Sequence, residues 1–343
     1  MFIAVRAALP LVAALAAASC GEADPPSAPE DTAPATPSAD STGAPDTLAA
    51  ADSLVPAAAV SYSGIPFGPY GLYANVTEFE WGPAPFTASL DNTFAGSIER
   101  RIAAARQQHH RLVLAMTGGT REYITSGKFD MAKWKARMNT FNTAAIKKAV
   151  ADAVADGTVV GNKLIDEPES PQWGGVLTKP KIDQMAAYVK NMFPTLPVGV
   201  TFGAPGYRWR TSERYKVVDW AGAQYVWNFN RGDITAWRDA VLSWAKAEGV
   251  TPVFSLNILD GGVPDKDGTW DCTGTGGKGT RSQRCRMTAD QVRTYGRAIG
   301  PYGCAMLMWR YDDAFMSKSA NQSAFRDVAS LLNSKPRRSC RRP

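Results

Sequence analysis

The chain has 343 residues, 45% of them hydrophobic, and a formal net charge of +6 at pH 7. The basic residues are spread rather than gathered into one stripe, which excludes the electrostatic pattern of a nucleic-acid-binding domain. The only histidines, His109 and His110, lie together before one predicted strand. That position excludes Ser-His-Asp and Cys-His catalysis and zinc sites with imidazole ligands.

Residues 1–20 have the pattern of an export signal. Arg6 is their only charge, and the apolar run Ala7–Ala18 is too short to span a bilayer. Ala17-Ala18-Ser19 before Cys20 resembles the lipobox of bacterial lipoproteins, which implies cleavage before Cys20 and acylation of that cysteine. Gly21, rather than Asp, follows the cysteine, which by the same resemblance allows sorting to an outer membrane. The prediction is therefore an exported protein of the cell envelope, lipid-anchored at a periplasmic face or in the outer membrane; plain secretion is the alternative.

Residues 21–61 are predicted to be a disordered tether between this anchor and a folded domain. They are rich in Pro, Ala and Ser and contain seven acids, but no Lys, Arg or aromatic residue. Such a segment cannot bury enough apolar surface to offset its ordering entropy. The rest of the chain carries a charge of about +12, and five of its basic residues lie in the tail 335–343. Solvation of this tail is expected, and contact with anionic lipid or an acidic partner is left open.

Residues 62–334 are predicted to form one α/β domain, a (β/α)8 TIM barrel, because strand-like and helical runs alternate over about 270 residues. The strand-like runs are Gly71–Val76, Arg111–Met116, Val159–Ile165, Val198–Phe202, Ala223–Asn228, Val253–Ile258 and Cys304–Trp309. The helical runs are Ser97–Gln107, Met131–Asp156, Lys181–Met192, Ile234–Glu248, Ala289–Ala298 and Ser323–Leu332. An eighth strand is expected within 128–156 or 217–220, or the barrel is incomplete or distorted. An open doubly wound sheet is the alternative, but no GxGxxG or Walker loop follows any strand.

The stretch Val159–Glu169 ends a predicted buried strand with two adjacent acids, Asp166 and Glu167, and then Pro168, which cannot continue a strand ladder. Chemistry in parallel α/β proteins is placed at such strand ends. The two acids therefore predict either a catalytic site or a cap for the following helix.

Polar and aromatic residues follow the other predicted strands too, and in a barrel these ends meet at one mouth. The residues proposed to bind substrate there are Asn75, Glu78, Trp173, Trp227, Asn228, Asn257, Asp260, Trp309 and Tyr311. Tyr123, Tyr207 and Trp209 add predicted aromatic faces in the loops. Rings stack on the C–H faces of sugars, while amides and acids bind hydroxyls. The pattern predicts a poly- or oligosaccharide ligand.

Asp166-Glu167-Pro168 resembles the Asn-Glu-Pro that ends the fourth strand of retaining barrel glycosidases, which implies that Glu167 is the acid/base. Other stretches resemble the chitinase-type glycoside hydrolase barrel: 115–119, 218–228 and 303–313, where the resemblance implies that Trp309 floors a sugar subsite. Residues 162–167 depart from that family's Asp-x-x-Asp-x-Asp-x-Glu signature. The resemblance therefore implies the fold and a carbohydrate ligand more than chitinase activity.

Glycoside hydrolysis needs one group to protonate the leaving oxygen and another to stabilise the oxocarbenium-like centre. Glu167 is the predicted general acid, with Asp166 raising its pKa by like charge. The predicted second carboxylate is Asp312, then Asp260, then Glu78. No cofactor or metal is predicted. Asp265, Asp267 and Asp271 flank glycines in a loop and could hold Ca²⁺ through oxygen ligands, but their spacing does not match an EF-hand, so a plain polar loop is favoured.

Four cysteines remain after Cys20. Cys272 and Cys285 bracket a glycine-rich loop, and Cys304 and Cys340 are both expected at the bottom of the barrel, so these two pairs are predicted disulfides.

Two functions remain open from the sequence. One is an anchored glycoside hydrolase acting on a polysaccharide. The other is a non-catalytic barrel lipoprotein that serves as a glycan-binding or accessory subunit of a membrane-associated envelope complex.

Overall fold

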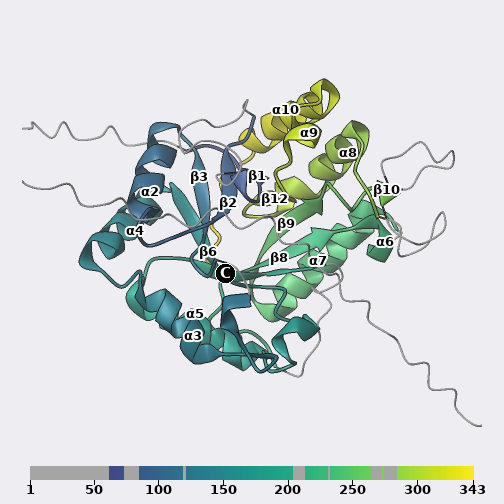
Figure 1. The fold of residues 1–343 in the computed structure, drawn as a ribbon. Helices are drawn as coiled ribbons and strands as arrows, with labels where there is room; N and C mark the ends of the chain where they lie inside the picture. The colour runs from purple at the N-terminus through teal and green to yellow at the C-terminus, as the bar shows by residue number, and fades with distance from the viewer. Residues whose placement is uncertain are drawn as a thin grey trace, which may run out of the picture. The chain divides into compact units, whose positions relative to one another are not determined.

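Eight parallel strands close into a barrel, so the fold is the predicted (β/α)8 TIM barrel (Figure 1). The computed structural model describes residues 62–72, 85–118, 121–203, 213–230, 232–263, 272–273 and 284–343, all within one compact unit of residues 57–343. Around the barrel, in chain order, the strands are β1 (Phe67–Pro69), β2 (Ala88–Asn92), β3 (Arg111–Ala115), β6 (Val159–Asp166), β7 (Val198–Phe202), β8 (Trp220–Tyr225), β9 (Thr251–Asn257) and β12 (Met306–Trp309).

The barrel closes where β1 meets β2. The Thr87 N–H donates to the Phe67 carbonyl at 2.8 Å, and the Gly71 N–H donates to the Leu90 carbonyl at 2.9 Å. Gly68 permits this approach, because a Cβ there would lie 1.7 Å from the Ala88 carbonyl oxygen. Closure removes the sheet edges and brings the C-terminal ends of all eight strands to one rim.

Helices surround the barrel and cover the outer face of its sheet (Figure 1). They are α2 (Ile98–Gln107), α3 (Met131–Asn139), α4 (Ala144–Asp156), α5 (Lys179–Met192), α6 (Trp227–Asn230), α7 (Ile234–Glu248), α8 (Ala289–Ile299), α9 (Asp313–Met316) and α10 (Ser319–Asn333). Side-chain oxygens of Thr143, Thr178, Asp233 and Thr288 cap the N-termini of α4, α5, α7 and α8. None of the described helices is both long enough and apolar enough to cross a membrane.

Short elements lie in the loops. The 3-10 turns are η1 (Arg121–Tyr123), η2 (Pro171–Trp173) and η4 (Gly300–Tyr302), and the two small hairpins are β4 (Ile124–Thr125) with β5 (Lys128–Phe129) and β10 (Cys272–Thr273) with β11 (Arg284–Cys285). Both predicted disulfides are present: Cys272 is bonded to Cys285 across β10 and β11, and Cys304 is bonded to Cys340.

Six of the seven predicted strands overlap observed ones, and three details of the predicted elements were wrong. The first strand lies before the predicted run 71–76, of which residues 73–76 lie outside the described part of the chain. The predicted strand at 223–228 begins earlier, at Trp220, and its last residues belong to α6. The predicted helix 131–156 is two helices, because Thr143 caps a second start.

The strand that the sequence did not reveal is β2, and it lies in neither of the expected stretches. Its sequence, ASLDN, is short and contains residues with low strand propensity. Ala88 and Leu90 are buried, and so are the polar Ser89 and Asp91. The Ser89 hydroxyl lies 3.2 Å from Nε2 of the buried His110, so a tertiary contact satisfies this polar residue. Burial lowers the pKa of His110 to about 3, and its role here is structural.

Trp220 fills the lower half of the barrel interior. Gly199 and Gly161 on the neighbouring strands make room for it: a Cβ on Gly199 would lie 2.0 Å from Trp220 Cδ2, and one on Gly161 would lie 2.7 Å from Trp220 Nε1. The interior cluster around the indole includes Leu90, Val113, Ala115, Val160, Val253, Ala305, Leu307 and the Cys304–Cys340 disulfide, and Tyr70 also belongs to it. Apolar side chains therefore fill the barrel at the N-terminal ends of its strands, and polar side chains can occupy the interior at the C-terminal ends.

A methyl group at Gly199 should destabilise the protein strongly. In the Gly199→Ala variant, the new Cβ would also approach the Trp220 carbonyl oxygen to 2.3 Å, and backbone atoms cannot give way. We expect a loss of about 3 kcal/mol in the free energy of unfolding, measured by urea denaturation. The matched control is Gly96→Ala, since a Cβ at Gly96 meets nothing within 4 Å. Equal stabilities of the two variants would contradict this account of the interior.

Candidate functional site

The upper interior of the barrel is lined by polar and aromatic side chains from several strands. Tyr70 lies just after β1, and its ring meets that of Trp309, the last residue of β12, edge-on at a centroid distance of 5.6 Å. On β9, the amide of Asn257 donates to the Gln224 side chain of β8 at 3.4 Å. The rim thus gathers an aromatic pair and an amide pair from strands that are distant in sequence.

Asp166 ends β6 inside this rim. The register of β6 shifts between Lys163 and Asp166, and such an irregularity lets residues three apart face the same side. Lys163 Nζ lies 3.5 Å from Asp166 Oδ2, and the Thr201 hydroxyl donates to Oδ1 of the same carboxylate. Lys163 is 6% exposed, so this cation is held inside the barrel, 5.9 Å from the centroid of the Tyr70 ring.

Glu167 is the first residue after β6, and its side chain is exposed. Its backbone φ is +41°, in the left-handed region that a residue with a side chain adopts at a cost of about 1–2 kcal/mol. Its N–H donates to the Thr201 carbonyl at 2.8 Å, and its carbonyl accepts from the Trp173 indole N–H at 2.9 Å. The carboxylate lies over Gly203, where a Cβ would come 2.4 Å from Oε1. The turn therefore fixes this carboxylate at the rim between the fourth and fifth strands.

Glu169 is a third acid in the same turn, and it is mostly buried. Its Oε2 has no hydrogen-bond partner. Burial raises the pKa of Glu169 to about 8, and the nearby charges of Glu167 and Asp166 add to that rise. Burial, followed by the charge of Asp166, likewise raises the pKa of Tyr70. Three carboxyl groups within four residues thus have three different surroundings. Asp166 lies beside a cation, Glu167 faces solvent and Glu169 is mostly buried.

The structure brings several predicted residues to one rim: Asp166, Glu167, Asn257, Asp260 and Trp309. Asp260 is partly buried, three residues after β9, with its Oδ2 3.9 Å from Arg284 Nη1. Trp227 and Asn228 lie in the short helix α6 beside the end of β8. Both amide atoms of Asn228 are buried without a hydrogen-bond partner. Asn75, Glu78, Tyr207, Trp209 and Cys20 lie outside the described residues.

Three predictions about individual residues need correction. Trp173 is fully buried, so its ring cannot stack on a sugar; its indole instead pins the Asp166–Glu167 turn. Tyr311 is 8% exposed and packs with Phe315 in the outer hydrophobic layer. The loop residue Tyr123 is also buried, so it offers no aromatic face. The catalytic role of Asp312 stays a prediction, and its carboxylate accepts the Phe315 N–H at 2.8 Å as the N-cap of α9.

Sequence reasoning missed Tyr70, Lys163 and Glu169. Tyr70 was missed because the first strand was placed too late. Lys163 faces the interior by ordinary alternation, two residues after the inward-facing Gly161, but a lysine inside a barrel has no local sequence signal. Its partner Asp166 turns to the same side through the register shift that follows Lys163. Glu169 could have been found from the sequence, because it is the third acid within four residues at the end of the predicted strand.

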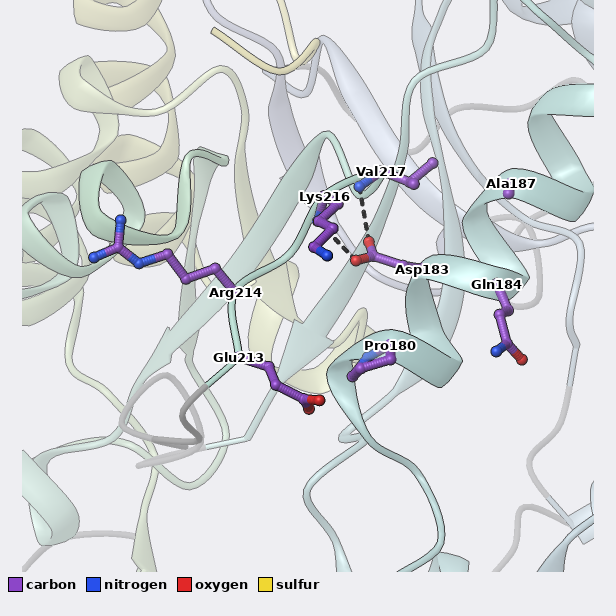
Figure 2. A pocket seen from close by; sticks show the side chains of 8 residues that line it. All are labelled: Pro180, Asp183, Gln184, Ala187, Glu213, Arg214, Lys216 and Val217. Atoms are coloured by element: carbon purple, nitrogen blue, oxygen red, sulfur yellow. Dashed lines mark hydrogen bonds between the residues drawn. The ribbon is translucent and has the colours of Figure 1, made fainter.

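Within the described ranges, no group of three or more His, Cys, Asp or Glu side chains is placed to hold a metal ion. The acids Asp265, Asp267 and Asp271, considered for calcium, lie outside those ranges. A cavity of about 530 Å³ lies outside the barrel, between α5 and residues 213–217 (Figure 2). The Asp183 carboxylate beside it accepts the N–H groups of Lys216 and Val217, and none of the rim residues lines it.

No family model and no curated protein matches the sequence. Among solved structures, the chain is similar to endoglycoceramidase II from Rhodococcus sp., with 11% identity, a TM-score of 0.46, and coverage of 74% of this chain and 76% of that one. It is also similar to xylanase 10B from Thermotoga maritima, with 10% identity, a TM-score of 0.43, and coverage of 79% of this chain and 96% of that one. A third similar structure is an endo-1,4-beta-mannanase from Eisenia fetida, with 9% identity, a TM-score of 0.41, and coverage of 72% of this chain and 80% of that one. At identities near one tenth, the chemistry has to be argued from this chain's own rim.

The raised pKa of Glu169 predicts a pH dependence of stability. The folded protein holds this proton more tightly than the unfolded chain, whose carboxyl has the ordinary pKa of 4.5. The proton on Glu169 therefore contributes its full stabilisation of the folded state below about pH 4.5, and this stabilisation is lost as the pH rises through about 8. Between pH 5 and 8, the wild type should lose about 2–4 kcal/mol more unfolding free energy than Glu169→Gln, measured by urea denaturation at each pH. Parallel profiles for the two proteins would refute the assignment.

Proposed function

We propose that the chain is an exported, lipid-anchored glycoside hydrolase that binds a polysaccharide at the rim of its barrel and cleaves it by carboxylate catalysis. The observation that carries the proposal is Glu167: an exposed carboxylate on a fixed turn at the end of the fourth strand, with Trp309 and Tyr70 on the same rim. Export and acylation at Cys20 are inferred from the sequence of residues 1–20.

Glu167 serves as the general acid in this proposal. Its backbone is held by the Thr201 carbonyl and the Trp173 indole, so its carboxyl can meet a glycosidic oxygen without reordering the turn. Asp166 is already bound by Lys163 and Thr201, and this leaves it to position the turn and supply negative charge rather than to deliver a proton. The role of Asp166 is therefore electrostatic.

The second carboxylate is Asp260 in this proposal. Of the three predicted candidates, Asp312 is engaged as a helix cap and Glu78 lies outside the described residues. Asp260 follows the seventh strand, and its main-chain N–H is held by the Asn257 side chain at 2.9 Å. In most glycoside hydrolases a carboxylate across the scissile bond from the acid acts at the oxocarbenium-like centre, and Asp260 is the described candidate for that role.

A non-catalytic glycan-binding or accessory subunit is the second candidate, and one observation favours it. The seventh strand ends in the amide Asn257, and the best-predicted partner acid, Asp312, serves a structural role. A barrel with one rim acid and no counterpart would bind sugar without cleaving it.

Replacing Glu167 by Gln should separate the two candidates. Wild type and Glu167→Gln would be compared for hydrolysis of polysaccharides and aryl glycosides, and for sugar binding by calorimetry. We expect the variant to lose about 10²–10⁴-fold in kcat while binding is retained, because loss of a general acid has that magnitude. Sugar binding without turnover by the wild type would support the accessory subunit, and equal rates would remove Glu167 as the acid.

A matched pair of variants tests the second carboxylate. Asn caps helices as well as Asp, so Asp312→Asn should keep the fold and wild-type turnover. Asp260→Asn should lose at least about 100-fold in kcat. The measurement is kcat on the substrate identified above, with a thermal melt as control. The reverse outcome would assign the second carboxylate to Asp312.

A further inference from the structure

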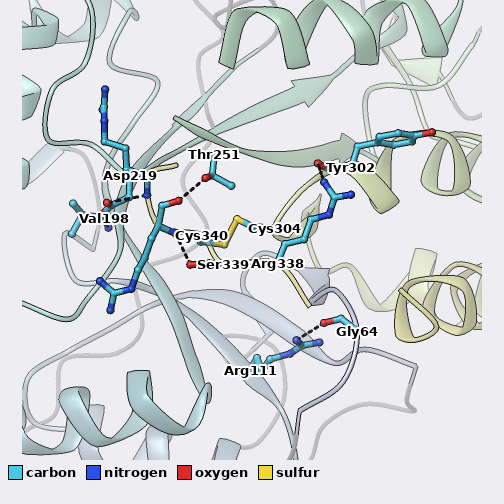
Figure 3. The surroundings of a disulfide bond; sticks show 12 residues. Gly64, Arg111, Val198, Asp219, Thr251, Tyr302, Cys304, Arg338, Ser339 and Cys340 are labelled. Atoms are coloured by element: carbon cyan, nitrogen blue, oxygen red, sulfur yellow. Dashed lines mark hydrogen bonds between the residues drawn. A yellow bond between two sulfur atoms is a disulfide. The ribbon is translucent and has the colours of Figure 1, made fainter. Parts of the chain in front are cut away.

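The C-terminal tail, predicted to be solvated, is folded across the N-terminal end of the barrel. Cys340 is 6% exposed and belongs to the barrel-interior cluster, where it is bonded to Cys304 just before β12 (Figure 3). The Thr251 hydroxyl at the start of β9 donates to the Arg341 carbonyl at 2.6 Å. The Arg342 N–H donates to Asp219, which precedes β8, at 3.2 Å. The tail is thus part of the barrel's bottom face.

Four tail arginines each lie at the end of a different outer element. Arg337 lies against Gly157 after α4, Arg338 donates to the Tyr302 carbonyl after α8, and Arg341 donates to the Thr195 carbonyl after α5. Arg342 reaches the Glu248 carbonyl at the end of α7. Cations are favoured at helix C-termini. One carbonyl uses only part of a guanidinium's five donors, and Arg337, Arg338 and Arg341 remain exposed.

The nearby acids do not neutralise these arginines. Asp156 pairs with Arg106 at 2.7 Å, and Asp219 pairs with Lys190 at 2.8 Å. In the described part of the chain, no carboxylate lies within 4.0 Å of a tail guanidinium. Burial lowers the pKa of Arg111 to about 10, with a further contribution from the nearby Arg337. The bottom face therefore carries uncompensated positive charge.

The chain enters the barrel on the same face. The Tyr62 hydroxyl lies 2.9 Å from the Thr158 hydroxyl, and the buried Arg111 donates to the Gly64 carbonyl at 2.8 Å. Thr158 follows Gly157, the glycine that Arg337 covers. Tyr62, the first described residue of the domain, therefore lies on the same face as Arg337. The rim acids Asp166 and Glu167 lie at the opposite ends of the strands.

We propose that the arginine face, defined as Arg337, Arg338, Arg341 and Arg342, docks on an anionic lipid surface, so that the rim of the barrel faces away from the membrane. The proposed orientation rests on the proposed acylation of Cys20: a tether of the 41 residues predicted for it could span about 130 Å when extended and would not by itself fix how the domain faces the membrane. Anionic lipid attracts the arginine face and repels the acidic rim. A tether would also keep the concentration of the domain high near the membrane surface, so each contact between the arginine face and lipid can be weak. The proposal does not depend on whether the rim hydrolyses its ligand.

The experiment measures sedimentation of the full chain, carrying Cys20→Ser to remove acylation, with vesicles of phosphatidylglycerol and phosphatidylcholine or of phosphatidylcholine alone. The expected result is binding that requires phosphatidylglycerol and falls steeply between about 0.1 M and about 1 M NaCl. Arg337→Gln/Arg338→Gln/Arg341→Gln should bind about 100-fold more weakly at low salt. A matched control is Arg100→Gln/Lys133→Gln/Arg326→Gln, which removes three exposed charges from α2, α3 and α10.

Several outcomes would overturn the proposal. These are wild-type binding by the tail variant, an equal loss in the control variant, or binding that is indifferent to salt or to phosphatidylglycerol. Salt dependence of the wild type tests the idea even if the tail variant is unstable. Hydrogen exchange on vesicles adds orientation: protection is expected at residues 335–343 and 156–158, and protection of 166–169 instead would reverse the proposed geometry.

Discussion

Packing around Trp220 is the constraint on which the site depends. The indole occupies the lower barrel only because Gly161 and Gly199 present no side chain toward it. With that volume filled and the Cys304–Cys340 disulfide beneath it, the floor is apolar and rigid. Polar side chains are then confined to the upper interior. The strand number and stagger set the width of the barrel, and Trp220 with the two glycines sets how far up the apolar filling reaches.

Three acids in one turn show how surroundings assign different chemistry to the same functional group. Asp166 is held by Lys163 and a hydroxyl, Glu167 is exposed on a fixed backbone, and Glu169 is buried with a pKa raised to about 8. Environments that separate the properties of neighbouring carboxyl groups are a common basis of acid catalysis. The buried Trp173 contributes by fixing the turn, because its indole N–H donates to the carbonyls of Asp166 and Glu167.

Charge is divided between the two ends of the barrel. Asp166, Glu167 and Asp260 lie at the C-terminal rim. The tail arginines lie at the N-terminal face, where helix C-termini also point and where Asp156 and Asp219 are paired with other cations. The arginines stabilise those helix ends and close the bottom of the barrel. The same arrangement gives the domain an electrostatic polarity, and the chain enters at its positive end beside Arg337. The same tail arginines thus stabilise the bottom of the barrel and provide the positive face in the proposed orientation.

The sequence by itself determined the alternation of strands and helices, the acids ending the fourth strand and the Cys272–Cys285 pair. Those features follow from local periodicity, from Pro168 and from two cysteines that bracket one loop; the Cys304–Cys340 pair could be predicted only by assuming the barrel. Tertiary structure decided the rest: the polar strand Ala88–Asn92, the burial of Trp173, the ion pair of Lys163 with Asp166 and the docked tail. Each depends on partners far away in the chain, such as His110 for β2 and Cys304 for the tail. Closure of the barrel brings those partners together, and no local pattern encodes it.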